Sequence, residues 1–507
     1  MNQNVQPIGN EKSKRAYTVP ECILAWLTYL CAFLFCKAFP VREYPLGGLI
    51  LVAALYIGTA VLLALLGNKL SAYPVAIGAS AILLAAAPVL SANPFLNFFS
   101  YGYAILSYAY FVYASIGKKT FSSVLLLDYA RALVVLPFRS LGGLFGALFM
   151  GRAKGSGKWI GRILLGVILS CVPTFIVGAL LEYDSGFTNL MKEIFSIEIG
   201  DLFTHLFHLV LALPIGIAVF SVYVSSSDGL GEDMVTEASL TDFRRQFRLL
   251  SSVSALTAVL PLLFVYVVFF ISQWKYYVSG FTGVLPEDFS YAEYAREGFF
   301  QLCFVSVINF VIIIAVTLCI RRKDERPPIA LKLITTVLSV FTLILISTAI
   351  SKMVLYIEHF GLTRLRVFST WFMILLAVLF ILAAVSMYVK RIKTVLVSVL
   401  VCLAFFSVLA LSCPDTLIAE YNVDRYLDGT LETVDIDAMY ELRDAAVPAM
   451  VRLYENMPKD ASVELKLDLY DYLEENLQDY GEKTSFFSFD LPAYRAKNAL
   501  SRVYHLK

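Results

Sequence analysis

The sequence predicts an all-α fold: a polytopic membrane helical bundle with about eleven transmembrane helices, followed by a small helical C-terminal domain. Three observations predict this fold class, namely the overall composition, the spacing of long apolar segments, and an acidic, less apolar C-terminal region. Of the 507 residues, 59% are hydrophobic and 16% are charged. Soluble domains are about 45–50% apolar and about 25% charged, so the composition is typical of an integral membrane protein.

The apolar segments have the length that a bilayer requires. A helix needs about 20 mostly apolar residues to cross the hydrocarbon core, and helices satisfy their own backbone hydrogen bonds there. The predicted spans are residues 20–39, 46–66, 74–91, 97–116, 160–181, 202–224, 249–272, 298–320, 329–351, 367–389 and 394–412.

Basic residues predict the orientation of these spans. If the N-terminus is cytoplasmic and the spans alternate, the inner segments before residue 413 hold 23 Lys and Arg and the outer segments hold 8. Cytoplasmic loops carry such an excess. We therefore expect a cytoplasmic N-terminal tail over 1–19, a transmembrane bundle over 20–412 and an extracytoplasmic domain over 413–507.

Residues 120–158 do not fit a simple span. The apolar part of this segment is interrupted by Asp128, Arg131 and Arg139, which would be costly inside the hydrocarbon core. Asp128 and Arg131 are three residues apart, so they would share one helix face. We predict an interfacial or re-entrant segment on the cytoplasmic side, with a crossing helix as the alternative. Its basic, glycine-rich end at 151–158 is typical of contact with anionic lipid headgroups.

The region from Cys413 to Lys507 differs in charge from the rest of the chain. It holds 19 Asp and Glu against 10 Lys and Arg, which leaves 21 acidic and 31 basic residues elsewhere. Its apolar residues recur at helical spacing, so we predict several short helices packed as a small domain. The basic residues lie in short loops between spans, and no nucleic-acid partner is expected.

Three strings resemble a known family: Tyr291-Ala-Glu-Tyr-Ala-Arg-Glu-Gly-Phe-Phe-Gln301, Gly361-Leu-Thr-Arg-Leu-Arg366 and Tyr421-Asn-Val-Asp-Arg-Tyr-Leu427. Over about residues 160–450 the chain resembles a bacterial family of multipass membrane proteins that is classed as a domain of unknown function. The resemblance implies a location in the bacterial cytoplasmic (plasma) membrane. It implies no catalytic or ligand-binding residue.

The first candidate functional residues are Tyr294, Arg296 and Glu297, where a predicted outer loop enters a span. They favour either an extracytoplasmic binding or gating element, or a helix start with a charged rim and aromatic anchors at the membrane interface.

The second candidates are Thr363, Arg364 and Arg366, which the predicted topology places outside. Arginines on that side often have acidic partners. Our hypothesis is that Arg364 or Arg366 docks the C-terminal domain onto the membrane body, with Glu358 as another available acid. The alternative is an ordinary interfacial arginine.

His205 and His208 are the metal-site candidates of this chain. Residues three apart share a helix face, so two imidazoles could meet one metal ion, with a third ligand from another helix. Hydrogen-bonded interfacial histidines are the alternative.

Asn309 is the most central polar residue of any predicted span. Intramembrane polar groups are typical of substrate paths, but Asn also holds helices together. No span centre holds an acid or a lysine, which argues against a carrier coupled to protons or cations.

No catalytic signature is present: the chain has no GxSxG, HExxH or P-loop pattern. No catalytic residue and no cofactor are predicted. The sequence favours a non-enzymatic envelope scaffold or sensor, with the lipid bilayer and an envelope protein bound by the C-terminal domain as partners. A transporter for a neutral or lipidic substrate is the first alternative. A membrane enzyme acting on lipid or glycan precursors, which needs Glu182, Asp201 or Glu297 to converge, is the second.

Overall fold

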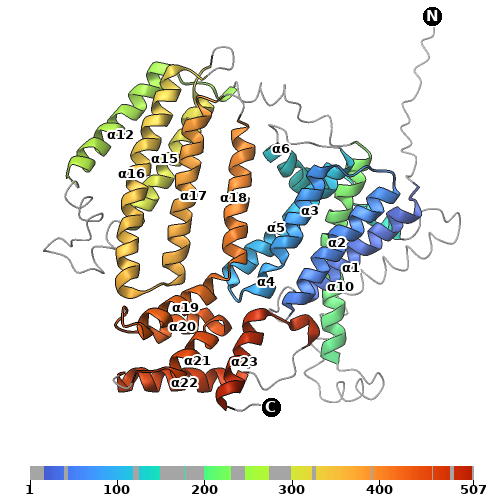
Figure 1. The fold of residues 1–507 in the computed structure, drawn as a ribbon. Coiled ribbons are helices and arrows are strands. Elements are labelled where there is room, and N and C mark those ends of the chain that lie inside the picture. The colour runs from blue at the N-terminus through green and yellow to red at the C-terminus, as the bar shows by residue number, and fades with distance from the viewer. Residues whose placement is uncertain are drawn as a thin grey trace, which may run out of the picture. The chain divides into compact units, whose positions relative to one another are not determined.

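The computed structural model describes residues 16–38, 44–117, 125–148, 177, 199–229, 246–272, 299–322, 327–389, 392–458, 461–479 and 485–504. Within these ranges the chain is helical, and the only β pairing is an isolated bridge between Leu250 and Ile320. The chain forms two compact units (Figure 1). The first holds residues 1–82, 104–120 and 126–232, and the second holds residues 83–103, 121–125 and 233–507.

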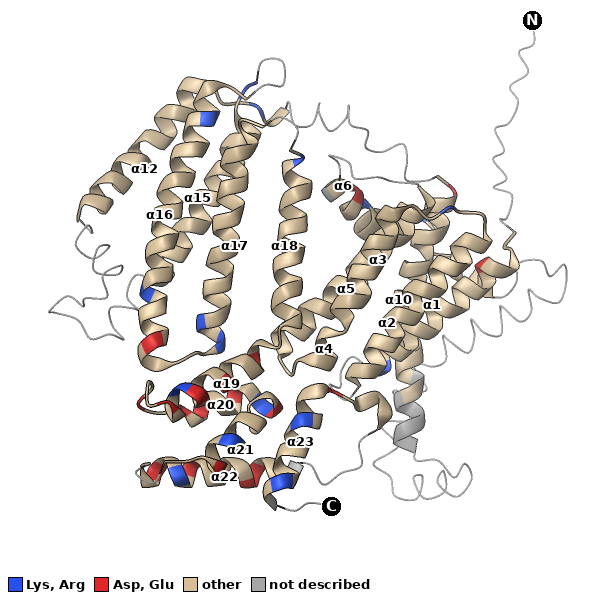
Figure 2. Cartoon of the chain, viewed as in Figure 1, with Lys and Arg blue, Asp and Glu red and all other residues tan. Residues whose placement is uncertain are grey.

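In the described part of the chain, nine helices are long and apolar enough to cross a membrane. They carry few charged residues along their lengths (Figure 2), so the chain is a multipass membrane protein of helical class. The helices are α1 (Val19–Ala38), α2 (Pro45–Leu65), α3 (Ala72–Ala85) continued by α4 (Ala87–Leu90), α10 (Ile199–Ser227), α12 (Ser252–Ser272), α15 (Phe299–Cys319), α16 (Ile329–Phe360), α17 (Arg364–Ser386) and α18 (Thr394–Leu411).

The count of eleven spans stays a prediction. The span predicted over 97–116 is present as helix α5 (Pro94–Ile116), which has 23 residues. It carries many hydroxyl-bearing tyrosines and is not among the nine helices that are apolar enough to span. The span predicted over 160–181 lies, except for Val177, outside the described residues.

In the first unit α1 packs against α2 and α10. The described part of the segment predicted to be interfacial or re-entrant consists of short pieces: α6 (Leu125–Ala130), a π-helical turn η1 (Arg131–Val135), a 3₁₀ turn η2 (Leu136–Phe138) and α7 (Gly143–Leu148). Pro137 cannot continue an α-helical hydrogen-bond ladder, which explains the break after the π turn. None of these described pieces has the length of a span.

In the second unit α16 packs against α12, α15 and α17. Helix α16 has 32 residues, about 48 Å at 1.5 Å per residue, whereas the hydrocarbon core is about 30 Å thick. The predicted span stopped at residue 351, yet the helix continues to Phe360 and ends at Gly361, whose φ is +71°. The extra turns carry the α16–α17 connection toward the C-terminal helices.

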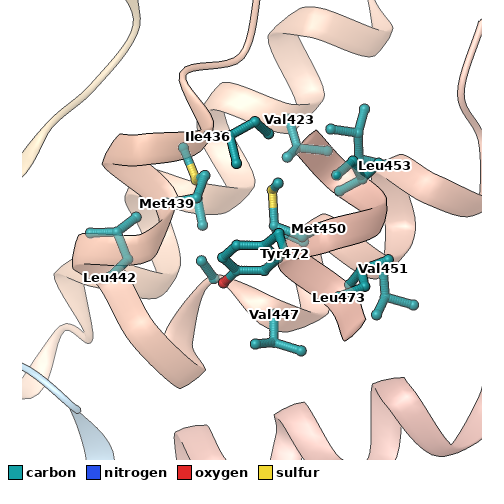
Figure 3. Packing of buried hydrophobic residues seen from close by; sticks show 14 of the residues in the cluster. Val423, Ile436, Met439, Leu442, Val447, Met450, Val451, Leu453, Tyr472 and Leu473 are labelled. Carbon is teal, nitrogen blue, oxygen red and sulfur yellow. The ribbon is translucent and has the colours of Figure 1, made fainter. Parts of the chain in front are cut away.

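The C-terminal helices are α19 (Pro414–Leu427), α20 (Ile436–Leu442), α21 (Val447–Glu455), α22 (Val463–Asp479) and α23 (Leu491–Tyr504); we call residues 414–504 the tail. The tail has its own hydrophobic core, in which the Tyr472 ring lies among Met439, Met450 and Ile436 (Figure 3). Leu362, from the α16–α17 connection, and Val367, from the first turn of α17, pack against the same core. Charged side chains are dense on the tail helices (Figure 2).

Candidate functional site

The candidate site is built around Asp415, the first acidic residue after the last spanning helix. Cys413 adopts left-handed backbone angles, φ 51° and ψ 56°, and Pro414 starts α19, so the chain turns sharply between α18 and α19. Asp415 therefore lies in the first turn of α19, where a negative charge is favoured by the helix dipole. Its side chain is 1% exposed.

Arg364 pairs with this buried carboxylate. Thr363 caps α17 by accepting a hydrogen bond from the backbone N–H of Arg366, which places Arg364 at the first position of the helix. The Arg364 guanidinium donates from Nε to Oδ1 of Asp415 at 3.0 Å and from Nη2 to Oδ2 at 2.5 Å. Two parallel hydrogen bonds of this kind fix both distance and orientation.

Asn93 supplies a second donor to the same carboxylate. Its Nδ2 lies 3.0 Å from Oδ1 and 3.2 Å from Oδ2 of Asp415. Its Oδ1 accepts from the backbone N–H of Leu96 at 3.1 Å, which caps α5. The carboxylate therefore joins the starts of α5, α17 and α19, although Asn93 and Asp415 are 322 residues apart in sequence. We call Asn93, Arg364 and Asp415 the junction triad.

A second set of hydrogen bonds lies about two to three turns further along α19. The Asn422 side chain accepts from the backbone N–H of Leu362 at 2.6 Å and donates to the Leu362 carbonyl at 2.8 Å. Arg425 donates to the Ile357 carbonyl of α16 at 3.1 Å. A Cβ at Gly361 would lie 2.5 Å from Oδ1 of Asn422, so the close approach requires glycine.

The contacts described for Arg366 lie at the end of α16. Its Nη1 donates to the carbonyls of Phe360 at 2.8 Å and Gly361 at 2.5 Å. Its guanidinium also lies 4.1 Å from the ring centre of Tyr356. These contacts cap the C-terminal end of α16. Of the two arginines, Arg364 is the one that hydrogen-bonds to a described residue of the tail.

Asn309 holds three spanning helices together. It is fully buried, its Oδ1 accepts from the Tyr266 hydroxyl of α12 at 2.6 Å, and its Nδ2 donates to Oγ1 of Thr342 on α16 at 2.9 Å. Thr342 in turn donates to the carbonyl of Leu338. Such bonds are typical of packing between membrane helices.

Two hydroxyl groups of α16 near this network differ from those of Tyr266 and Thr342 in their hydrogen bonding. Thr335 and Ser339 are fully buried, and their oxygen atoms have no hydrogen-bond partner among the residues that the structure describes. Residues four apart lie on one face of a helix, so the two groups form a short polar track. A buried polar group without a partner is unfavourable unless water or a ligand completes it.

The other predicted candidates are not assembled into a site by the described residues. Tyr294, Arg296 and Glu297 lie outside the described residues, as does Glu182, and the side chain of Asp201 is not described. His205 is exposed on α10 and His208 is half-buried. Among the described residues no three potential metal ligands gather.

The first unit holds buried charged groups that the sequence analysis did not single out as a site. Glu21 is 5% exposed. It accepts hydrogen bonds from the backbone of Thr18 at 2.7 Å and from the Tyr223 hydroxyl at 2.8 Å, which is a capped helix start. Arg131 is also buried and donates to the Tyr113 hydroxyl at 3.3 Å. The Thr-x-x-Glu spacing was the available signal for Glu21.

The helices and the junction triad define a multipass membrane protein with a helical tail joined to its spans. The chain belongs to the family described as Domain of unknown function (DUF4153), which matches residues 78–453. The match begins earlier than the expected position near residue 160 and ends within α21, so it includes the whole junction triad. No curated protein and no solved structure matches the chain.

Proposed function

We propose that the protein is a non-enzymatic scaffold or sensor of the bacterial cell envelope, in which the tail presents a binding surface to an envelope protein and is coupled to the membrane helices. The observation that carries this proposal is Asp415, which is buried and bonded to Arg364 and Asn93. The triad joins the tail to the starts of two membrane-level helices, so a force or ligand acting on the tail reaches them directly.

The chemistry of the triad supports coupling rather than simple attachment. A buried ion pair contributes little net stability, because desolvation offsets most of the attraction, but removing one partner leaves an uncompensated charge. Apolar packing would attach a tail at lower cost. A charged junction instead favours one arrangement strongly over all others, which is the property that a scaffold or sensor requires.

The location is part of the proposal: the bacterial plasma membrane, with a cytoplasmic N-terminus and an extracytoplasmic tail. The distribution of Lys and Arg supports this orientation. In the second unit, the α16–α17 connection contacts α19, so the two lie on the same side of the membrane. The predicted topology requires that arrangement, since residues 361–363 and the tail are both predicted to be outside.

A labelling experiment tests the orientation. The chain has no cysteine beyond Cys413, so Leu467→Cys introduces a single thiol on α22, where Leu467 is exposed. We expect a membrane-impermeant maleimide to label this variant in intact cells and to leave the unsubstituted chain at its background level. Labelling that appears only after the membrane is permeabilised would place the tail inside.

Complementation tests the role. In a strain that lacks the gene, envelope integrity is measured with the full chain, a chain ending at Ser412, Asp415→Ala and Asn309→Leu. The scaffold or sensor predicts that the chain ending at Ser412 and Asp415→Ala fail to complement and that Asn309→Leu complements, provided all are equally abundant in the membrane. Full complementation by the chain ending at Ser412 would refute the proposal.

A transporter for a neutral or lipidic substrate is the second candidate. The hydroxyls of Thr335 and Ser339, which no described residue bonds, favour it. In a variant free of native cysteines, Ser339→Cys should then react with a water-soluble thiol reagent. The scaffold or sensor predicts no reaction at Ser339 under conditions that label Leu467→Cys.

A further inference from the structure

The tail exposes all of its phenylalanines in one short turn. Beyond Cys413 the sequence contains three phenylalanines: Phe486, Phe487 and Phe489. They are 71%, 50% and 40% exposed, respectively, in and directly after the 3₁₀ turn η4 (Phe486–Ser488). Tyr494, whose ring centre lies 5.8 Å from that of Phe489, is also exposed. We call Phe486, Phe487, Phe489 and Tyr494 the aromatic turn.

Exposure of this kind contrasts with the rest of the tail. Phenylalanine is among the residues most often buried in folded domains, and the tail buries Met439, Leu453 and Tyr472 in its own core. A contiguous group of exposed aromatic rings is typical of a contact surface for a protein or a membrane.

The position of the turn favours a membrane. It directly precedes α23, and α23 packs against α4, the last part of the span that ends at Leu90. The Cys413 thiol, just after the end of α18, donates to the Leu90 carbonyl at 3.2 Å. Arg495 of α23 is close enough to Cys413 to act on it electrostatically. The start of α23 therefore lies at the level where two spanning helices end.

The charge of α23 also fits a lipid surface. The tail as a whole is acidic, but residues 491–504 contain Arg495, Lys497 and Arg502 and no acidic residue. All three basic side chains are exposed. Basic side chains beside exposed aromatic rings are typical of segments that lie in the interface of a membrane with anionic lipids.

We propose that the aromatic turn inserts into the interfacial region of the membrane that the protein spans, and that α23 binds the anionic headgroups beside it. This contact holds the far end of the tail, whereas the junction triad holds its beginning at α19. The inference goes beyond the scaffold or sensor role, because lipid contact would serve any function of the tail.

Nitroxide accessibility in the full-length protein tests the proposal. Native cysteines are replaced, with serine at position 413 to retain a donor to Leu90, and one spin label is placed by Phe487→Cys. The protein is reconstituted in phosphatidylcholine vesicles with or without phosphatidylglycerol. The matched control is Leu467→Cys, because Leu467 is exposed on α22, which packs against α20 and α21.

At position 487 we expect collisions with oxygen to exceed collisions with a water-soluble nickel chelate severalfold, and more so with phosphatidylglycerol. At position 467 the nickel chelate should collide more often. Equal, water-like accessibility at both positions would overturn the proposal and leave the turn as a surface for a protein partner. If the nitroxide at position 487 inserts equally deeply with and without phosphatidylglycerol, the role given to α23 is overturned. Neither result depends on whether Asp415→Ala complements.

Discussion

Two buried polar networks of the second unit differ in charge and in reach. The Asn309 network is neutral and joins α12, α15 and α16, which are neighbours in sequence. The junction triad contains an ion pair and joins α5, α17 and α19, whose bonded residues lie 51 and 322 residues apart. A neutral network can loosen at modest cost, whereas a charged one cannot lose a partner without stranding a charge. The first holds spans together, and the second determines where the tail sits.

The largest expected effect is that of Asp415→Ala. The substitution leaves the largely buried Arg364 guanidinium without its acid. This should lower the free energy of unfolding of the docked tail by about 3–5 kcal/mol. The measurement is protease resistance of the tail as a function of denaturant. Asp424→Ala is the matched control, because Asp424 pairs with Arg452 at 2.7 Å on the surface, where such pairs are worth about 0–1 kcal/mol. Equal effects of the two variants would mean that the buried pair contributes no more to the tail than the surface pair.

Gly361→Ala should have the next largest effect. It forces a side chain into a backbone conformation with φ +71° and places a Cβ against Asn422, at a cost of about 1–3 kcal/mol for the strained backbone alone. The control is Gly429→Ala, whose φ is +70° but whose Cβ would meet open space. The same protease assay should show a greater loss for Gly361→Ala, and an equal loss would mean that the Asn422 contact is not tight.

Asn309→Leu should have a smaller effect. The substitution leaves the Tyr266 hydroxyl without its acceptor, while Thr342 keeps its bond to Leu338. Hydrogen bonds between membrane helices are worth about 0.6 kcal/mol on average, so we expect a drop of about 1 kcal/mol in the stability of the spans. Thermal unfolding in detergent measures it, and the protease resistance of the tail should not change. A loosened tail would contradict the separation of the two networks.

The last effect is confined to a window of pH and concerns Asp490, which caps α23 by accepting from the backbone of Ala493 at 2.7 Å. Burial raises the pKa of this carboxyl from 3.8 to about 6. An acid with a raised pKa contributes stability that is complete below about pH 4 and is lost as the pH rises through 6. Asp490→Asn keeps an accepting oxygen and removes the titration. Denaturant midpoints of the tail at pH 5 and pH 7 should converge in the variant, and an unchanged difference would contradict this assignment.

Much of the fold was predictable from sequence because a helix that crosses a bilayer needs about 20 mostly apolar residues. The apolar segments around α1, α2, α12, α15 and α18 begin and end close to the predicted residues. The span predicted over 329–351 is shorter than helix α16, which continues to Phe360 and is longer than the hydrocarbon core requires. Apolar composition predicts the part of a helix that spans the bilayer, and it does not predict where a longer helix ends.

The site was less predictable. Arg364 could be singled out because it opposes the charge rule for outer segments, and an acid of the tail was one proposed partner. The identity of that acid, and the part played by Asn93, depend on packing between segments 322 residues apart, which no local pattern encodes. Asn422 and Gly361 lie in two of the strings that resemble the family, but the close contact between them was not predicted, for the same reason. The notable position of Asp415, directly after the last span, was the available signal.

The most direct test of the account is the distance between α16 and the tail. Spin labels at Val354→Cys and Leu467→Cys, both exposed positions, are measured by pulsed dipolar spectroscopy in a variant free of native cysteines. The account predicts one narrow distance distribution, kept in Asp424→Ala and broadened in Asp415→Ala. An equally narrow distribution in Asp415→Ala would show that the junction triad does not position the tail.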